Sequence, residues 1–117
     1  MSNQRPSGSG HWIAQRVSAV ALIPLGLWFI WSLSTRADLS RPAWLAFIAA
    51  PWHAALIVAF LLVALMHSYL GVQVVIEDYV HTRVRERALH GLSTALHFIA
   101  ALAGAWAVIR IVQGGAP

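Results

Sequence analysis

The sequence predicts an all-α membrane protein whose three transmembrane helices form part of a heteromeric helical bundle. Of its 117 residues, 59% are hydrophobic and 10% are charged, whereas about a quarter of the residues in an ordinary soluble domain are charged. Three apolar runs are long enough to cross a bilayer. Two of these runs carry a deep histidine, and three helices alone do not supply all the partners that such polar groups need, which favours a larger bundle.

The three predicted spans cover residues 17–33, 54–76 and 88–112. The first contains Pro24 and Gly26, which a transmembrane helix tolerates when it packs against neighbours. The second reaches roughly 35 Å at about 1.5 Å per residue, enough to cross with some tilt. The third is rich in alanine and glycine, which favours close contact between helices in lipid. Because the first run already has spanning length and two more follow it, we expect no cleaved signal peptide.

Composition also assigns the segments outside the spans. Residues 1–12 are mostly polar and rich in glycine and serine, so we expect a mobile N-terminus before a transmembrane anchor domain over residues 13–117. Residues 44–48 (WLAFI) are typical of a segment that lies in the membrane interface. Residues 77–87 form a tight polar turn between the second and third spans.

The charged residues indicate topology. Eight arginines stand against four acids, for a net charge of +4, which is too few charges for a nucleic-acid surface. Five arginines fall in the N-terminal part and the 77–87 turn, and three fall on the opposite side: Arg5, Arg16, Arg83, Arg85 and Arg87, against Arg36, Arg41 and Arg110. Basic residues are enriched in cytoplasmic loops, so this bias predicts a cytoplasmic N-terminus and turn, with the C-terminus outside.

Histidines are the candidate metal ligands, because the chain has no cysteine. His67 and His97 lie deep in the second and third spans, each about ten residues from the 77–87 turn. They either hold a haem between two helices of this chain, or His67 pairs with a histidine of another protein while His97 is a structural hydrogen-bonder. Periodicity alone does not decide between these arrangements. The remaining histidines lie at or near span ends, where interfacial roles are expected: His11, His53, His81 and His90.

The second span ends in an acid and a phenol that are in register with its histidine. At about 100° per residue, the eleven steps from His67 to Asp78 return to within roughly 20° of the same direction, about 16 Å along the axis. Gly71 lies on the same face and lets a bulky group approach, while Tyr79 follows Asp78. Arg16 opens the first span as an interfacial anchor or as a partner for carboxylates. Together these residues suggest a cofactor in the membrane and a polar site at its edge.

The pattern His-x3-Gly-x6-Asp-Tyr on the second of three spans, with an arginine opening the first, resembles one known family. It is similar to the hydrophobic membrane anchor subunits (D subunits) of bacterial succinate dehydrogenase, respiratory complex II. The segment HWIAQRVSAVALIPL also resembles the start of the bacterial forms. The likeness runs from about His11 to the end of the third span, although the third span resembles the family only in length and hydrophobicity.

The resemblance implies a role for each candidate residue. His67 becomes one axial ligand of a haem b whose second histidine comes from the neighbouring cytochrome b subunit, and Arg16 lies near the haem propionates. Tyr79 hydrogen-bonds a ubiquinone carbonyl, and Asp78 helps to shape the quinone site and its proton supply. His97 has no counterpart in the matched pattern.

The resemblance also implies an assembly. The chain would anchor the iron–sulfur and flavoprotein subunits, which hold the iron–sulfur clusters and FAD, and would have no catalytic activity alone. The complex would oxidise succinate and reduce ubiquinone in the tricarboxylic acid cycle and respiratory electron transport. Its location would be the bacterial cytoplasmic (inner) membrane, in contact with lipid, with the C-terminus in the periplasm.

Three other classes remain open. A quinol:fumarate reductase anchor would have the same fold with the opposite direction of turnover. A cytochrome b subunit of another dehydrogenase, such as formate dehydrogenase, would carry several histidines arranged for two haems. A small homo-oligomeric transporter would carry a carboxylate inside the membrane, and no acid of this sequence lies deep in a span.

Overall fold

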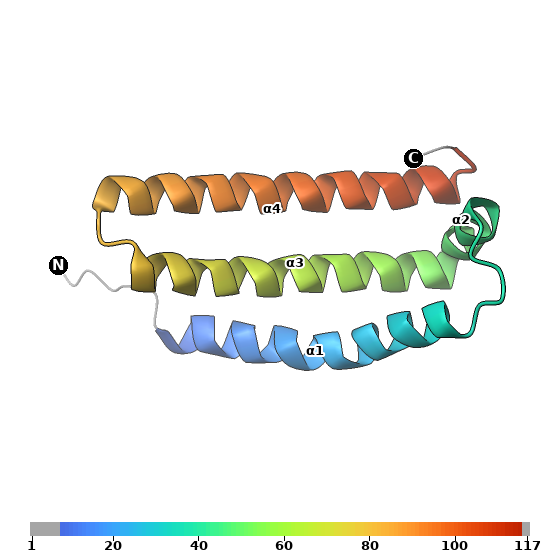
Figure 1. The fold of residues 1–117 in the computed structure, drawn as a ribbon, viewed down its shortest axis with the longest axis horizontal. Coiled ribbons are helices and arrows are strands. Elements are labelled where there is room, and N and C mark those ends of the chain that lie inside the picture. Colours follow the sequence, from blue (N-terminus) through green and yellow to red (C-terminus); the bar gives the residue numbers. More distant parts are fainter. Residues whose placement is uncertain (1–7, 116–117) are drawn as a thin grey trace.

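The computed structural model describes residues 8–115, and in this range it contains helices and no strand. The helices are α1 (Gly8–Ser34), α2 (Arg41–Ala49), α3 (Pro51–Tyr79) and α4 (Arg83–Val112). Three of them, α1, α3 and α4, are long and apolar enough to cross a membrane. They run antiparallel with α3 in the middle, and the short α2 lies at one end of the row (Figure 1). The predicted all-α fold with three spans is confirmed.

Each long helix extends beyond the apolar run that predicted it. Helix α3 has 29 residues, or about 44 Å, compared with a hydrocarbon core of about 30 Å. The apolar runs mark only the hydrocarbon, whereas a helix continues wherever its backbone hydrogen bonds can form. The turn expected over residues 77–87 is therefore only residues 80–82. Of the expected N-terminal segment, residues 8–12 belong to α1, and residues 1–7 lie outside the described part.

Helix α2 contains the predicted interfacial segment and begins at well-defined capping residues. The Ser40 hydroxyl accepts the backbone N–H of Ala43, and Pro42 occupies the second helical position, where a missing N–H costs little. Helix α3 starts at Pro51, directly after Ala50 in an extended conformation. Helix α2 therefore packs against the start of α3 and the end of α4. We call this the α2 end of the bundle, and the opposite end the turn end.

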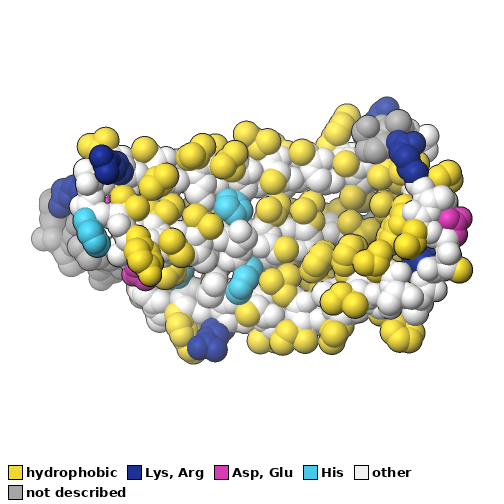
Figure 2. Space-filling view, in the orientation of Figure 1, with side chains coloured by type: hydrophobic (Ala, Val, Ile, Leu, Met, Phe, Trp, Pro, Cys, Tyr) yellow, Lys and Arg dark blue, Asp and Glu magenta, His cyan; other side chains and the backbone are white. Residues whose placement is uncertain are grey.

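The middle helix, α3, holds the structure together. It contacts both α1 and α4, whereas α1 and α4 do not contact each other within the described residues. Of residues 8–115, only four hydrophobic ones are buried: Ala54, Ile76, Val108 and Ile111. Large apolar side chains instead cover the outside, and Figure 2 shows them along one face with basic side chains toward the two ends. Such a surface suits lipid or other membrane helices rather than water, so the chain is a multi-pass membrane protein.

Close packing between α3 and α4 depends on a glycine. A Cβ atom built at Gly104 of α4 would overlap the end of the Leu61 side chain of α3, with Leu61 Cγ at 3.4 Å. Small residues at such positions let membrane helices approach closely, because lipid provides no hydrophobic driving force between them. The alanine and glycine content of the third span predicted this kind of contact, and Gly104 is the residue at which the structure requires it.

A chain of hydrogen bonds also joins α3 to α4. The Gln73 amide donates to the Tyr69 hydroxyl at 2.8 Å, and the Tyr69 hydroxyl lies 3.2 Å from the hydroxyl of Thr94. Thr94 donates to the carbonyl of His90 at 2.8 Å, so the single Thr94 hydrogen is used and Tyr69 must be the donor between them. Each hydroxyl thus has both a donor and an acceptor as neighbours.

We predict that Gly104→Ala destabilises the protein and that Gly91→Ala does not. A Cβ at Gly91 on the same helix meets no atom within 4 Å. Overpacking typically costs about 1–3 kcal/mol, and both variants share the same gain in helix propensity of about 1 kcal/mol. The thermal midpoint of the purified protein in detergent should therefore fall for Gly104→Ala relative to Gly91→Ala. In the double variant with Leu61→Ala, Gly104→Ala should no longer lower the thermal midpoint. Equal midpoints for the two glycine variants would disprove the contact between Gly104 and Leu61.

Candidate functional site

His67 lies in the middle of α3 and is oriented by α1. Its Nδ1 atom is 2.9 Å from the hydroxyl of Ser18, which is only 1% exposed and is the most fully buried side chain of the described residues. The same hydroxyl donates to the backbone carbonyl of Gln15 at 3.0 Å. Two helices therefore meet at a polar contact in the middle of the bundle.

This geometry selects one form of the imidazole. A serine hydroxyl has a single hydrogen, and Ser18 directs it at the Gln15 carbonyl, so His67 Nδ1 must donate to Ser18. In a neutral imidazole, a hydrogen on Nδ1 leaves Nε2 with a free lone pair. Within residues 8–115, Nε2 of His67 has no hydrogen-bond partner. A ring held through one nitrogen with the other nitrogen open is the arrangement that metal-bound histidines use.

His97 differs from His67 because both of its nitrogens are occupied. Nδ1 lies 2.8 Å from the carbonyl of Ser93 and must donate to it, and Nε2 lies 3.2 Å from the hydroxyl of Ser68 on α3. The ring also contacts Tyr69 edge-on, with centroids 5.5 Å apart. His97 therefore links α4 to α3. Of the two deep histidines, His67 is the one that offers an unengaged nitrogen within the described residues.

Gly71 and Arg16 take positions that the spacing of the sequence did not reveal. A Cβ at Gly71 would lie 3.8 Å from the side-chain amide nitrogen (Nε2) of Gln15, so α1 approaches this glycine. Arg16 is exposed, and its guanidinium lies 5.3 Å from the centroid of the Trp12 ring. It is two residues from Ser18, about 200° around the helix. Because Ser18 faces α3, Arg16 faces away from α3 and does not contact His67.

Asp78 and Tyr79 form the last turn of α3 at the turn end. Both are exposed, Tyr79 by 79%, and no ion pair joins Asp78 to an arginine in the part of the chain that the structure describes. Helix α3 is continuous from His67 to Tyr79, which confirms the helical register that the spacing argument assumed. Tyr79 is thus about 18 Å along the axis from His67 and turned by roughly 120°.

The serine partners were not singled out from the sequence. Ser93 precedes His97 by four residues, the spacing of neighbours on one helical face, so this pair could have been found. Ser18 and Ser68 bind histidines on other helices, and sequence spacing carries no signal for pairs between helices. Among the described residues there is no cluster of three or more histidine, cysteine, aspartate or glutamate side chains that could hold a metal ion.

Comparisons with known proteins agree with the resemblance drawn from the motif. A model of the family described as succinate dehydrogenase/fumarate reductase transmembrane subunit matches residues 2–109. The succinate dehydrogenase hydrophobic membrane anchor subunit of Rickettsia typhi is 33% identical over 82 residues, which cover 68% of this chain and 64% of the relative. The protein of the same name from Rickettsia bellii is 31% identical over 104 residues, which cover 82% of each chain.

The extent of these matches decides what they show. The alignment spans slightly less than two thirds of the Rickettsia typhi relative, whereas the family model covers almost all of this chain. The chain therefore belongs to the family of succinate dehydrogenase/fumarate reductase transmembrane subunits.

Proposed function

We propose that the chain is the membrane anchor subunit of a succinate:ubiquinone oxidoreductase in the inner membrane of a bacterium. It would hold the flavoprotein and iron–sulfur subunits at the membrane, share a haem b with a cytochrome b subunit and form part of the quinone site. The observation that carries the proposal is the state of His67, whose Nδ1 is fixed by Ser18 and whose Nε2 is open. Family membership supports it independently.

The haem proposal depends on the fit between this chain and the group. His67 would supply Nε2 as one axial ligand, and the cytochrome b subunit would supply the other. Ser18 would keep the imidazole in the ligating tautomer and fix the plane of the ring. Arg16 forms no ion pair within residues 8–115, so its guanidinium is available to a propionate carboxylate. A bound haem b would accept and donate single electrons.

The quinone proposal depends on the end of α3. Tyr79 presents an exposed hydroxyl that can donate to a quinone carbonyl, and Asp78 beside it can receive or deliver a proton. Quinone reduction needs electrons and protons together, which favours the membrane surface facing the soluble subunits. The FAD and iron–sulfur clusters would lie in those subunits, beyond the turn end. The basic residues of this end, Arg83, Arg85 and Arg87, support a cytoplasmic location for it.

We predict that His67→Ala removes or alters the low-spin b-type haem spectrum of the purified complex, because an axial ligand is lost. His97→Ala should leave the haem spectrum in place and lower thermal stability, since its bonds to Ser68 and Ser93 join two helices. The measurement is a dithionite-reduced visible spectrum with haem content per complex. A haem lost from His97→Ala but kept in His67→Ala would reverse the assignment.

Ser18 should act on the haem through His67. Ser18→Ala leaves Nδ1 without its acceptor, so we predict about 10- to 100-fold weaker haem retention, the usual cost of losing such a supporting bond, and a shifted midpoint potential. Ser18→Thr keeps the hydroxyl and should restore both. Ser34→Ala, a change of an exposed serine of the same helix whose hydroxyl donates to the Trp31 carbonyl, is the control. A potential and haem content unchanged in Ser18→Ala would show that the bond does not hold the ligand.

Tyr79→Phe should separate quinone reduction from the rest of the complex. The change removes one hydroxyl and keeps the ring, so we expect quinone reductase activity to fall about tenfold, the equivalent of one hydrogen bond. Succinate oxidation by an artificial soluble dye should stay unchanged. Tyr69→Phe is the matched control, because its hydroxyl serves the contact between α3 and α4. Full quinone activity in Tyr79→Phe would exclude the residue from the site.

A second candidate is the anchor of a quinol:fumarate reductase, because the matching family includes both enzymes. The proposed haem and quinone contacts of this chain are the same for both directions. The relative rates of succinate oxidation and fumarate reduction by the purified complex decide between them.

A further inference from the structure

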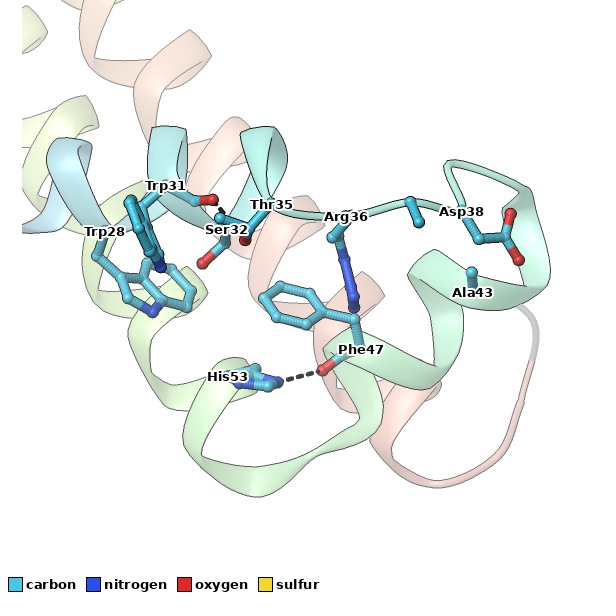
Figure 3. Close-up of a pocket in the computed structure, with 10 residues that line it drawn as sticks. Trp28, Trp31, Ser32, Thr35, Arg36, Asp38, Ala43, Phe47 and His53 are labelled. Atoms are coloured by element: carbon cyan, nitrogen blue, oxygen red, sulfur yellow. Dashed lines mark hydrogen bonds between the residues drawn. The ribbon is translucent and has the colours of Figure 1, made fainter.

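A cavity with polar and aromatic walls lies at the α2 end, at the opposite end of α3 from Tyr79. It has a volume of about 650 Å³, and its lining includes aromatic and polar side chains from α1, the 35–40 loop, α2 and the start of α3. Figure 3 shows Trp28, Trp31 and Ser32 on one side of this cavity and Arg36 with Phe47 on the other. Neither the haem nor the quinone proposal uses these residues.

Arg36 is the basic residue that lines this cavity, and its hydrogen-bonding groups are not all paired. Its guanidinium carbon lies 3.9 Å from the centre of the Phe47 ring and 5.2 Å from that of Trp44. These rings cover the cation, and its Nε atom is buried with no hydrogen-bond partner. A buried N–H without an acceptor is costly, and guanidinium groups in such positions characteristically bind carboxylate or phosphate oxygens.

Ser32 provides a second unengaged donor. This residue is 9% exposed, and its hydroxyl forms no hydrogen bond within the described residues. It lines the same cavity as Arg36. The cavity lining thus offers two hydrogen-bond donors, a charged one from Arg36 with its buried and unpaired Nε atom and a neutral one from Ser32. Such a pair suits an anionic ligand that has several oxygen atoms.

Asp38 also lines this cavity, but its carboxylate is engaged by Ser40. Its carboxylate accepts the backbone N–H of Ser40 at 2.8 Å. This bond, then one from the Ser40 side chain and, as a smaller effect, the charge of Arg36 lower the pKa of Asp38. In Figure 3 the carboxylate points away from the Arg36 guanidinium. No ion pair joins the two residues in the described part of the chain, so Asp38 does not occupy the hydrogen-bond donors of the Arg36 guanidinium.

The walls of the cavity are held firmly. Phe47 stacks on His53 with centroids 4.0 Å apart, and Trp28 stacks on Phe47 at 6.2 Å. His53 Nδ1 donates to the Phe47 carbonyl at 2.9 Å, which ties α3 to α2. On the N-terminal side of Trp31, exposed apolar side chains continue along one face of α1 toward the middle of the membrane: Ile23, Leu27 and Ile30. The cavity around Arg36 therefore lies at one end of an exposed apolar face of α1, which we call the apolar track.

We propose that this cavity binds the phosphate group of a phospholipid from the outer leaflet. Arg36 and Ser32 hold the phosphate oxygens, the aromatic side chains enclose the headgroup, and the acyl chains lie along the apolar face of α1. Free phosphate has the same oxygen chemistry but cannot use the apolar track. The ligand is therefore the lipid, and it is recognised by its phosphate and its chains together.

Native mass spectrometry of the full chain, purified with the subunits that accompany it, tests the proposal. In nanodiscs of phosphatidylethanolamine and phosphatidylglycerol, the wild-type protein should retain a phospholipid that Arg36→Gln loses. The loss of a charge-assisted hydrogen bond predicts retention that is weaker by about tenfold or more. Arg41→Gln removes an exposed arginine of the same end that does not line the cavity, and it should retain the lipid.

Two further measurements on the wild-type protein do not depend on the folding of any variant. Replacing the phospholipids by a phosphate-free glycolipid should abolish retention, and adding millimolar inorganic phosphate should leave the phospholipid bound. The proposal is overturned if Arg36→Gln and Arg41→Gln retain phospholipid equally, or if the glycolipid is retained as well as the phospholipid. Displacement by inorganic phosphate alone would overturn the lipid as the ligand.

Discussion

Inside a membrane, a polar side chain must find its partner within the protein, and this constraint governs the arrangement of the helices. The three most buried polar residues are serines, Ser18, Ser32 and Ser93. Two of them bind a histidine. Since the hydrocarbon offers no donors or acceptors, the bond from Ser18 to His67 fixes the rotation of α1 against α3. Ser93 holds His97 on its own helix, and His97 in turn bonds to Ser68 of α3. The apolar side chains, which mostly face outward, adapt to this arrangement.

Helix α3 connects two different kinds of interface. His67 contacts α1, whereas the next residue, Ser68, bonds to His97 of α4. Successive residues of a helix point about 100° apart, so adjacent positions reach neighbours on different sides. On the side of α4 the contact is closed by Gly104 and by hydrogen bonds from Ser68 to His97 and from Tyr69 to Thr94. On the side of α1 it leaves one imidazole nitrogen unused. The two interfaces of α3 therefore differ, because the α4 side is joined by close packing and hydrogen bonds, whereas the α1 side leaves one imidazole nitrogen without a partner among the described residues.

Sequence reasoning predicted the part of this structure that depends on local composition. The three spans follow from hydropathy, and the motif on one helix led to His67, whose role as a ligand stays a prediction. The helices begin before each predicted span, because hydropathy follows the hydrocarbon and not the backbone hydrogen bonds, whereas α4 ends at Val112, where the third span was expected to end. Ser18 was missed because its partner is 49 residues away, and the relative rotation of two helices cannot be read from spacing. The cavity around Arg36 was missed for the same reason, since four segments build it.

The contact between Ser18 and His67 joins the first membrane helix of the chain to the second. Until both helices have entered the bilayer and docked, the imidazole can carry its hydrogen on either nitrogen. Docking removes that freedom, because the Ser18 hydroxyl accepts a hydrogen only from Nδ1 once its own is given to Gln15. The position of the hydrogen on the His67 ring thus depends on whether α1 and α3 have docked correctly. If α1 docked in another orientation, the same sequence would no longer hold that hydrogen on Nδ1.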